Sequence, residues 1–154
     1  MLTTGQDSMR TLIIPLQGRN LLLPNVAVAE VVPYVRPREV EGAPDWLLGT
    51  LSWRGLNIPL ISYDRLQGLD NSAGIGQARI AVLNTVQAGS GLQFYALVTA
   101  GIPQLKRVDA DAVQVSADTA EGALSQVQIG DIQAMIPDLD ALESTVAQCW
   151  KQVA

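Results

Sequence analysis

The apolar residues of this 154-residue chain fall in short runs that are separated by clusters of turn-forming residues. Runs of this length, rich in branched and aromatic side chains, predict β-strands rather than helices. Pairs of runs flank tight connections, as at Arg54-Gly55, and such pairs predict β-hairpins. We expect four hairpins, formed by 11–16 with 21–23, 47–53 with 56–62, 79–86 with 92–99, and 124–129 with 132–136.

Two details of these strands can be predicted from the sequence. Pro15 has no N–H to donate to a neighbouring strand, so its strand should lie at a sheet edge or carry a bulge there. Leu56, Ile58 and Leu60 alternate along the second hairpin and should therefore share one face.

The C-terminal residues change to a helical period. Asp138 is a candidate N-cap, and Lys151 lies where the helix dipole favours a cation. We expect a helix over 137–153 that packs on the protein's own sheet, with a partner protein as the alternative for its apolar face. The apolar positions at helical spacing are Leu139, Leu142, Val146, Cys149, Trp150 and Val153.

The chain has the length of one domain, which we assign to 1–154 with a flexible N-terminus over 1–10. A weak internal echo relates Gly49-Thr50-Leu51-Ser52 to Gly122-Ala123-Leu124-Ser125, each followed by a tight turn and an apolar strand. Similar modules are therefore expected over 11–67 and 79–136, joined by a loose connection at 68–77. This pattern favours a mostly-β fold of two small barrels with a C-terminal α-helix over a single sandwich.

Composition excludes several classes of function. The net charge of −5 has the wrong sign for binding nucleic acid or anionic membranes. The chain contains no histidine, which removes histidine-based nucleophilic systems, general bases and metal sites. The first residues resemble no export signal, and a single Cys149 is consistent with a reducing compartment, so we expect a cytoplasmic location.

The remaining chemical motifs lack the context that a catalytic or metal site needs. Gly74-Ile75-Gly76 has no third glycine, and Cys149 lies on an apolar stripe without an adjacent base. The carboxylate pairs Asp109/Asp111 and Asp138/Asp140 have no further oxygen ligands nearby in the sequence. We therefore expect no catalytic residue, no cofactor and no metal.

One charged residue interrupts an otherwise apolar strand. Glu30 lies among valines in 26–35, where a carboxylate is costly unless a cation or a donor meets it. Arg54, at the tight turn beside Trp53, is the obvious partner. The pair is either an intramolecular ion pair that clamps a strand to a hairpin or a charged element beside a protein-binding groove, and both roles can hold together.

The same residues carry a resemblance to a known family. Val28-Ala29-Glu30-Val31-Val32, followed by a 49–62 segment with Arg54-Gly55 and Pro59, resembles the signature of CheW-like chemotaxis coupling proteins. The resemblance extends over residues 11 to 143. Pro137-Asp138-Leu139 retains the family's final Asp-Leu, whereas Ser62 and Thr99 stand where the family has aspartate. The chain is therefore similar to a divergent member.

This resemblance implies two five-stranded SH3-like barrels packed together and a non-enzymatic adaptor. Such adaptors bridge the cytoplasmic tips of methyl-accepting chemoreceptors to the regulatory domain of a CheA-type histidine kinase, in flagellar or pilus-linked systems. The implied protein-binding residues are Glu30, Val31, Trp53, Arg54 and Gly55. The alternative is a carrier of an apolar small molecule, with a cavity lined by Trp46, Trp53, Phe94 and Tyr95.

Overall fold

A computed structural model describes residues 8–17, 19–68, 78–85, 91–109, 113–115, 123–129 and 131–153, to which all structural statements refer. The strands are β1 (Ser8–Pro15), β2 (Asn20–Pro24), β3 (Val28–Pro33), β4 (Leu47–Trp53), β5 (Leu56–Ile61), β6 (Arg79–Asn84), β7 (Phe94–Val98), β8 (Gln104–Asp109), β9 (Val113–Val115), β10 (Ala123–Ile129) and β11 (Ile132–Pro137). The helices are the 3₁₀ turn η2 (Asn25–Ala27), the single-turn α1 (Tyr63–Leu66) and the long α2 (Leu139–Val153).

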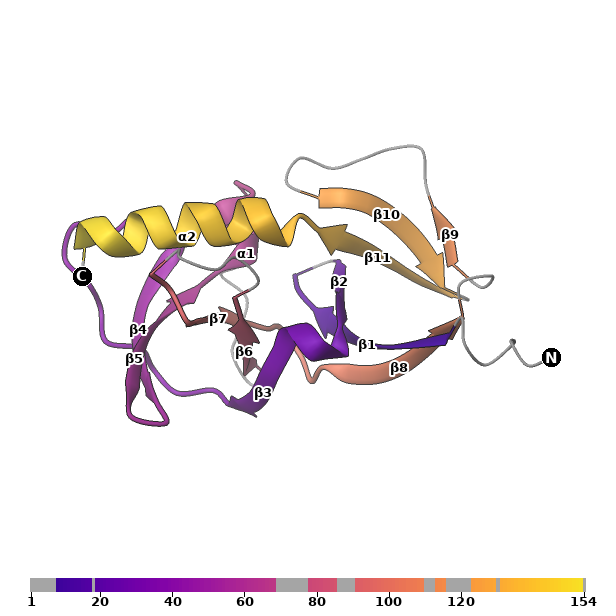
Figure 1. Cartoon of the computed structure of the whole chain (residues 1–154), viewed down its shortest axis with the longest axis horizontal. Helices are drawn as coiled ribbons and strands as arrows, with labels where there is room; N and C mark the ends of the chain where they lie inside the picture. Colours follow the sequence, from indigo (N-terminus) through magenta and orange to yellow (C-terminus); the bar gives the residue numbers. More distant parts are fainter. Residues whose placement is uncertain are drawn as a thin grey trace.

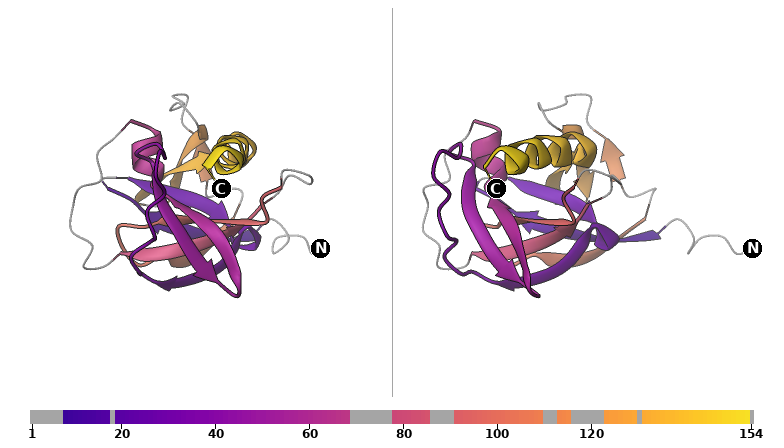
Figure 2. Two further views of the ribbon diagram at one scale, coloured as in Figure 1. Left: turned by 90° about the vertical axis from the view of Figure 1, so that its left-hand side faces the viewer. Right: turned by 60° about the vertical axis from the view of Figure 1, so that its left-hand side comes forward.

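The strands form two sheets that lie toward opposite ends of the molecule (Figure 1). One sheet has the order β8-β1-β2-β11-β10-β9 and the other the order β3-β6-β7-β5-β4. Figure 2 shows the second sheet curling around its own interior, with α2 along one side. The expected mostly-β fold with a C-terminal helix is confirmed, with six strands rather than five in the first sheet.

The second sheet closes into a barrel through a backbone bridge between its edges. Arg38, in the chain that follows β3, exchanges two backbone hydrogen bonds with Thr50 of β4, at 3.0 and 2.8 Å. Gly49 makes this seam possible, because a Cβ on it would lie 2.3 Å from the carbonyl oxygen of Arg38. Its φ of 150° is also one that glycine tolerates best.

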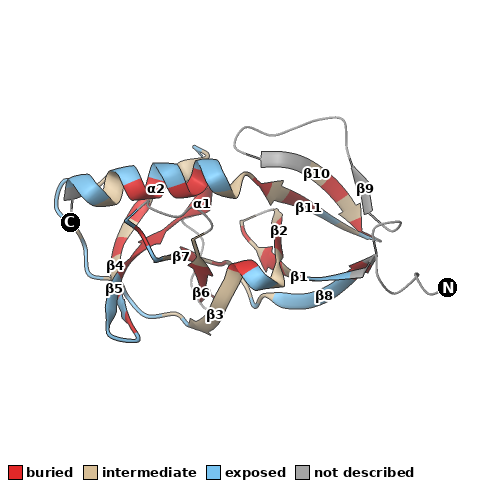
Figure 3. Cartoon of the chain, in the orientation of Figure 1, coloured by how far each residue is buried: buried red, intermediate tan, exposed pale blue. Residues whose placement is uncertain are grey.

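The buried apolar residues separate into three cores. Each sheet encloses a small one, and the largest core lies between the sheets and is covered by α2 (Figure 3). This shared core draws side chains from both sheets and α2: Ile14, Leu16, Leu21, Leu23, Leu47, Ile61, Tyr63, Ala81, Leu83, Leu92, Tyr95, Leu97, Met135, Leu142, Val146 and Ala147.

The four predicted hairpins are present as antiparallel pairs. Pro15 is tolerated for a different reason from the one expected. Strand β1 lies between β8 and β2 rather than at an edge, and Pro15 is its last residue, opposite Asn20. Its missing N–H therefore costs no hydrogen bond in the middle of a ladder, while its carbonyl accepts the N–H of Ala100 at 2.8 Å.

The pairing of distant strands differs from the expected modules. Strands β1 and β2 belong with β8–β11, whereas β3–β7 form the other sheet, so the ranges 11–67 and 79–136 do not correspond to the two sheets. The pairing of β1 with β8 also begins at Ser8, so residues 8–10 are part of a strand rather than a flexible terminus. Residues 1–7, most of the 68–77 connection and Gly122 lie outside the described residues.

The predicted C-terminal helix is confirmed. Asp138 caps its start by accepting the N–H of Ala141 at 3.1 Å. Leu142 and Val146 are buried in the shared core, and Trp150 packs against the rim of that core while remaining partly exposed. The helix therefore docks on its own sheets, as expected. Within the described part of the chain, none of the helices has the length and apolarity needed to cross a membrane.

The barrel seam generates a stability prediction. We expect Gly49→Ala to lower the free energy of unfolding by about 2 to 4 kcal/mol, because the new methyl group collides with backbone and φ is unfavourable. Chemical denaturation monitored by circular dichroism measures this loss. Gly42→Ala is the matched control, since its φ of 79° is strained but nothing lies within 4 Å of the added carbon. Equal losses in the two variants would show that the seam imposes no steric requirement.

Candidate functional site

The β4–β5 hairpin ends in a two-residue turn made by Arg54 and Gly55. Their φ values are 49° and 78°, and Trp53 pairs with Leu56 across the turn. Positive φ at both central positions is the geometry of a type I′ turn, which matches the right-handed twist of the flanking strands. Among the described residues, Arg54 alone has positive φ without being glycine. This conformation costs a side-chain-bearing residue about 1 to 2 kcal/mol.

Glu30 reaches from β3 to this hairpin. Its backbone pairs with Val82 just after an irregularity in the β3–β6 ladder. Val82 belongs to the core of the second barrel, so the Glu30 side chain lies on the same side of the sheet as that core. One carboxylate oxygen, Oε1, accepts both the indole Nε1–H of Trp53 at 2.9 Å and Nη2–H of Arg54 at 3.3 Å. The expected meeting of Glu30 and Arg54 is therefore present.

Aromatic contacts complete the cluster. Trp53 packs edge-on against Phe94, with ring centroids 4.8 Å apart at 61°. The Arg54 guanidinium carbon lies 4.6 Å from the centroid of the Trp53 ring, within the range of a cation–π interaction. Trp53 thus belongs to the core of the second barrel, and the Arg54 guanidinium lies over its ring.

Exposure decides which contact matters for stability. The Trp53 residue is only 8% exposed, whereas the Glu30 and Arg54 side chains are 41% and 65% exposed. An ion pair this exposed contributes less than about 1 kcal/mol. A hydrogen bond from a buried indole to a carboxylate is worth more, about 1.5 to 3 kcal/mol. Glu30 therefore stabilises the barrel mainly through Trp53 and only weakly through Arg54.

The other residues expected at the site have different positions. Gly55 belongs to the turn itself, with open space around it. Val31 pairs with Ala81 and lies on the opposite face of β3 from Glu30, so it is not part of the cluster. Leu56 does not share the burial of Ile58 and Leu60, because the hairpin tip projects beyond the barrel and leaves Leu56 37% exposed. Sequence alternation alone could not reveal this apolar side chain beside Arg54.

The two positions that depart from the family pattern have local structural roles. Ser62 is fully buried and its Oγ accepts the N–H of Arg65 at 3.2 Å, which caps α1. Thr99 is also buried; its Oγ1 accepts the N–H of Arg79 at 3.0 Å and donates to the carbonyl of Gly101 at 2.6 Å. Each buried hydroxyl thus forms hydrogen bonds with nearby backbone groups.

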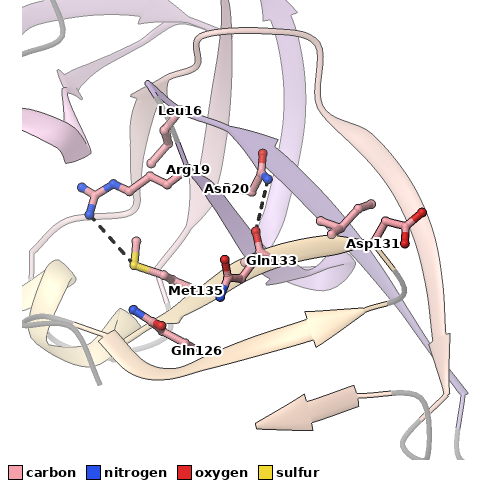
Figure 4. Close-up of a pocket in the computed structure, with 9 residues that line it drawn as sticks. Leu16, Arg19, Asn20, Gln126, Asp131, Gln133 and Met135 are labelled. Atoms are coloured by element: carbon pink, nitrogen blue, oxygen red, sulfur yellow. Dashed lines mark hydrogen bonds between the residues drawn. The ribbon is translucent and has the colours of Figure 1, made fainter. Parts of the chain in front are cut away.

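A second polar contact, which sequence reasoning missed, joins the two sheets. Asp64 of α1 is 3% exposed and accepts Arg19 Nε–H at 3.1 Å and the Gln17 N–H at 3.2 Å. The Arg19 guanidinium also lies 5.5 Å from the Tyr63 ring centroid. Figure 4 shows its other contact, from Nη1 to Met135 Sδ at 4.0 Å. Burial raises the pKa of Tyr63, and Arg19 opposes that rise. The neighbouring groove has a volume of about 670 Å³ and is lined by amide, charged and apolar side chains.

The aromatic residues proposed for an apolar cavity lie in separate places. Tyr95 is buried in the shared core, with Trp46 packed against the same core, whereas Trp53 and Phe94 belong to the interior of the second barrel. Phe94 and Tyr95 are consecutive in β7 and so point to opposite faces. These four side chains therefore line no common cavity, which removes the basis of the carrier hypothesis.

Cys149 and the Asp138/Asp140 pair form no reactive cluster in the described part of the chain, and the other acidic pair, Asp109/Asp111, has side chains outside it. Cys149 is partly buried, and burial raises the pKa of its thiol, which keeps it protonated near neutral pH. Asp138 is occupied as a helix cap. Among the residues that the structure describes, no three Cys, Asp or Glu side chains are grouped as metal ligands would be.

The unequal contacts of Glu30 generate a prediction. Glu30→Ala should lower the free energy of unfolding by about 1.5 to 3 kcal/mol, since it leaves the Trp53 indole without its acceptor. Arg54→Ala should cost less than about 1 kcal/mol. Glu30→Gln, which keeps an acceptor oxygen, should recover most of the loss. Urea denaturation followed by Trp fluorescence and circular dichroism measures all three variants. A Glu30→Gln variant as unstable as Glu30→Ala would mean that the charge, and not the hydrogen bond, is what matters.

Comparison with known proteins agrees with this architecture. The chain matches the family model described as CheW-like domain over residues 10–146. A solved structure, the scaffolding protein TtCheW from Thermoanaerobacter tengcongensis, superposes with a TM-score of 0.71 at 18% identity, and the match covers 85% of this chain and 84% of that one. This likeness confirms the expected fold of two SH3-like barrels. No curated protein sequence matches the chain. Because the family model covers most of its length, the chain belongs to the CheW-like domain family.

Proposed function

We propose that this protein is a non-enzymatic adaptor that couples chemoreceptors to a CheA-type histidine kinase, and that the Glu30–Trp53–Arg54 cluster is a contact site for one of these partners. Membership of the CheW-like family supports a scaffolding role in chemotaxis signalling in general. The observation that carries the site assignment is the position of Arg54, which is held by Glu30 and Trp53 yet 65% exposed.

Fold stability does not account for an arginine at this position. The left-handed backbone conformation of Arg54 costs about as much free energy as its exposed ion pair with Glu30 contributes, or more. Asparagine or glycine would serve the turn better. Residues held in unfavourable backbone conformations are concentrated at functional sites. A binding role for the Arg54 side chain explains why the turn retains it.

The geometry of the cluster suits protein recognition. Contacts to Glu30 and to the Trp53 ring restrict the guanidinium before any partner arrives, which reduces the entropy lost on binding. The exposed Leu56 beside it offers apolar area. Arginine beside an apolar contact and an aromatic ring is typical of the residues that dominate binding energy at interfaces. We infer that the partner presents a carboxylate to Arg54.

The proposed partners are the regulatory domain of the kinase and the cytoplasmic tip of a methyl-accepting receptor, with the adaptor in the cytoplasm and recruited to membrane-associated arrays. Gly55 allows the turn to approach a partner closely, because nothing lies within 4 Å of its Cβ position.

We assign Val31 a supporting role within β3 and no direct contact with the partner protein. The pathway controls either flagellar swimming or pilus-driven twitching motility, and the motility phenotype of a deletion strain distinguishes them.

The proposal predicts a selective loss of binding. Arg54→Ala should bind a kinase regulatory domain or a receptor cytoplasmic fragment at least about tenfold more weakly, a loss of roughly 1.4 kcal/mol. Its circular dichroism spectrum should remain that of the unmodified protein. Isothermal titration calorimetry with each fragment measures the effect and identifies which partner uses the site.

Arg36→Ala is the matched control, since it removes another exposed arginine that follows β3 but does not contact Glu30. It should retain the original affinity for both fragments. If well-folded Arg54→Ala also retained affinity for both, the cluster would be structural only and the site assignment would be wrong.

A further inference from the structure

The outer face of β1 and β8 carries two like charges in direct register. Arg10 lies opposite Arg107 in the antiparallel ladder, and the next pair on the same face is Leu12 opposite Leu105. Both arginines are exposed, and Leu105 is 62% exposed, although Leu12 packs partly against the shared core. Figure 3 shows β8 as an almost continuously exposed strand. We call Arg10, Leu12, Leu105 and Arg107 the β1–β8 patch.

The requirements of the fold do not explain this arrangement. Like charges directly opposite each other across two strands destabilise a sheet. Neither arginine forms an ion pair with another described residue. The chain has fifteen acidic residues against ten basic ones, so acidic residues are more numerous than the cations they could pair with. An arginine opposite another arginine is therefore not the pairing that sheet stability favours. An exposed leucine beside them adds apolar surface that water solvates poorly.

We propose that the β1–β8 patch docks an acidic segment of a partner protein, whose carboxylates face Arg10 and Arg107 while its apolar side chains cover Leu12 and Leu105. Charge complementarity selects this occupant. A second copy related by a two-fold axis would place arginines against arginines, which opposes self-association through this face. The patch lies on the first sheet, whereas Glu30, Trp53 and Arg54 lie on the second, so this inference does not depend on the proposed function.

The patch can be tested with a defined probe. The probe is a fluorescein-labelled synthetic peptide of alternating glutamate and leucine, and binding to the full-length protein is followed by fluorescence anisotropy. We expect saturable binding that weakens as salt is raised, because exposed charges are screened. In a labelled sample, the amide resonances that shift should include those of 9–13 and 104–108. Arg10→Glu/Arg107→Glu should bind at least tenfold more weakly.

Arg36→Glu/Arg38→Glu is the matched control, since it reverses two other exposed arginines and changes the net charge by the same amount. It should bind as the unmodified protein does. If the control lost as much affinity as the patch variant, the attraction would be a general charge effect and the proposal would be wrong. Absence of binding to the unmodified protein would also overturn it.

A stability measurement separates binding from folding. The single variant Arg10→Glu places opposite charges in register, so its thermal midpoint should equal or exceed that of the unmodified protein while peptide binding falls. If the charge-reversed double variant does not fold, Arg10→Gln/Arg107→Gln replaces it in the binding assay. A clear drop in the thermal midpoint of Arg10→Glu would show that the arginines serve the fold, contrary to the proposal.

Discussion

The shared apolar core between the two sheets is the constraint on which the rest of this structure depends. The interiors of the two barrels are small, and cores of that size alone rarely give a domain useful stability. The shared core adds side chains from both sheets and from α2, with Ile14, Leu83 and Val146 each almost fully buried. The chain also leaves the first sheet after β2 and returns to it at β8. The first barrel therefore cannot form from one continuous segment, because the whole second barrel, β3 to β7, is inserted between its strands. Together with the shared core, this leads us to expect that the two barrels fold as a unit.

This core also explains where the polar chemistry is found. The central strands are buried on both faces, so the run Ile80-Ala81-Val82-Leu83 is wholly buried and shows no alternation. Most exposed charged side chains consequently lie at turns, on the helices, near strand ends or on the outermost strands. Two described carboxylates are exceptions: Glu143 of α2 is fully buried, and buried Asp64 accepts hydrogen bonds from Arg19 and a backbone N–H at the junction of the sheets. Arg54 and Arg107 follow the general rule.

The sequence was sufficient to predict features that depend on residues close together in the chain. Hairpins, the α2 helix and its Asp138 cap follow from local propensities, and the cost of burying a charge identified Glu30 and its partner. Features that depend on distant pairing could not be predicted. Strand β8 was not predicted, because Lys106-Arg107 interrupt its apolar pattern. Its place in the sheet depends on pairing with β1, which lies far from it in the chain. Arg19 and Asp64 are likewise 45 residues apart. The echo between the two halves indicated similar modules but carried no information on which strands they share.

The arrangement of the two candidate surfaces suits an adaptor for a physical reason. One surface is the Arg54 hairpin tip of the second barrel, and the other is the β1–β8 patch of the first. Both sheets contribute to one close-packed core, and such cores deform little, so the separation and relative orientation of the two surfaces are fixed by the fold. A partner bound at one surface is then presented to a partner at the other in a single geometry. A flexible linker between independent barrels would instead spread the bound partners over many orientations and lower their effective concentration. The same buried side chains that stabilise the chain thus determine how precisely it could position two proteins.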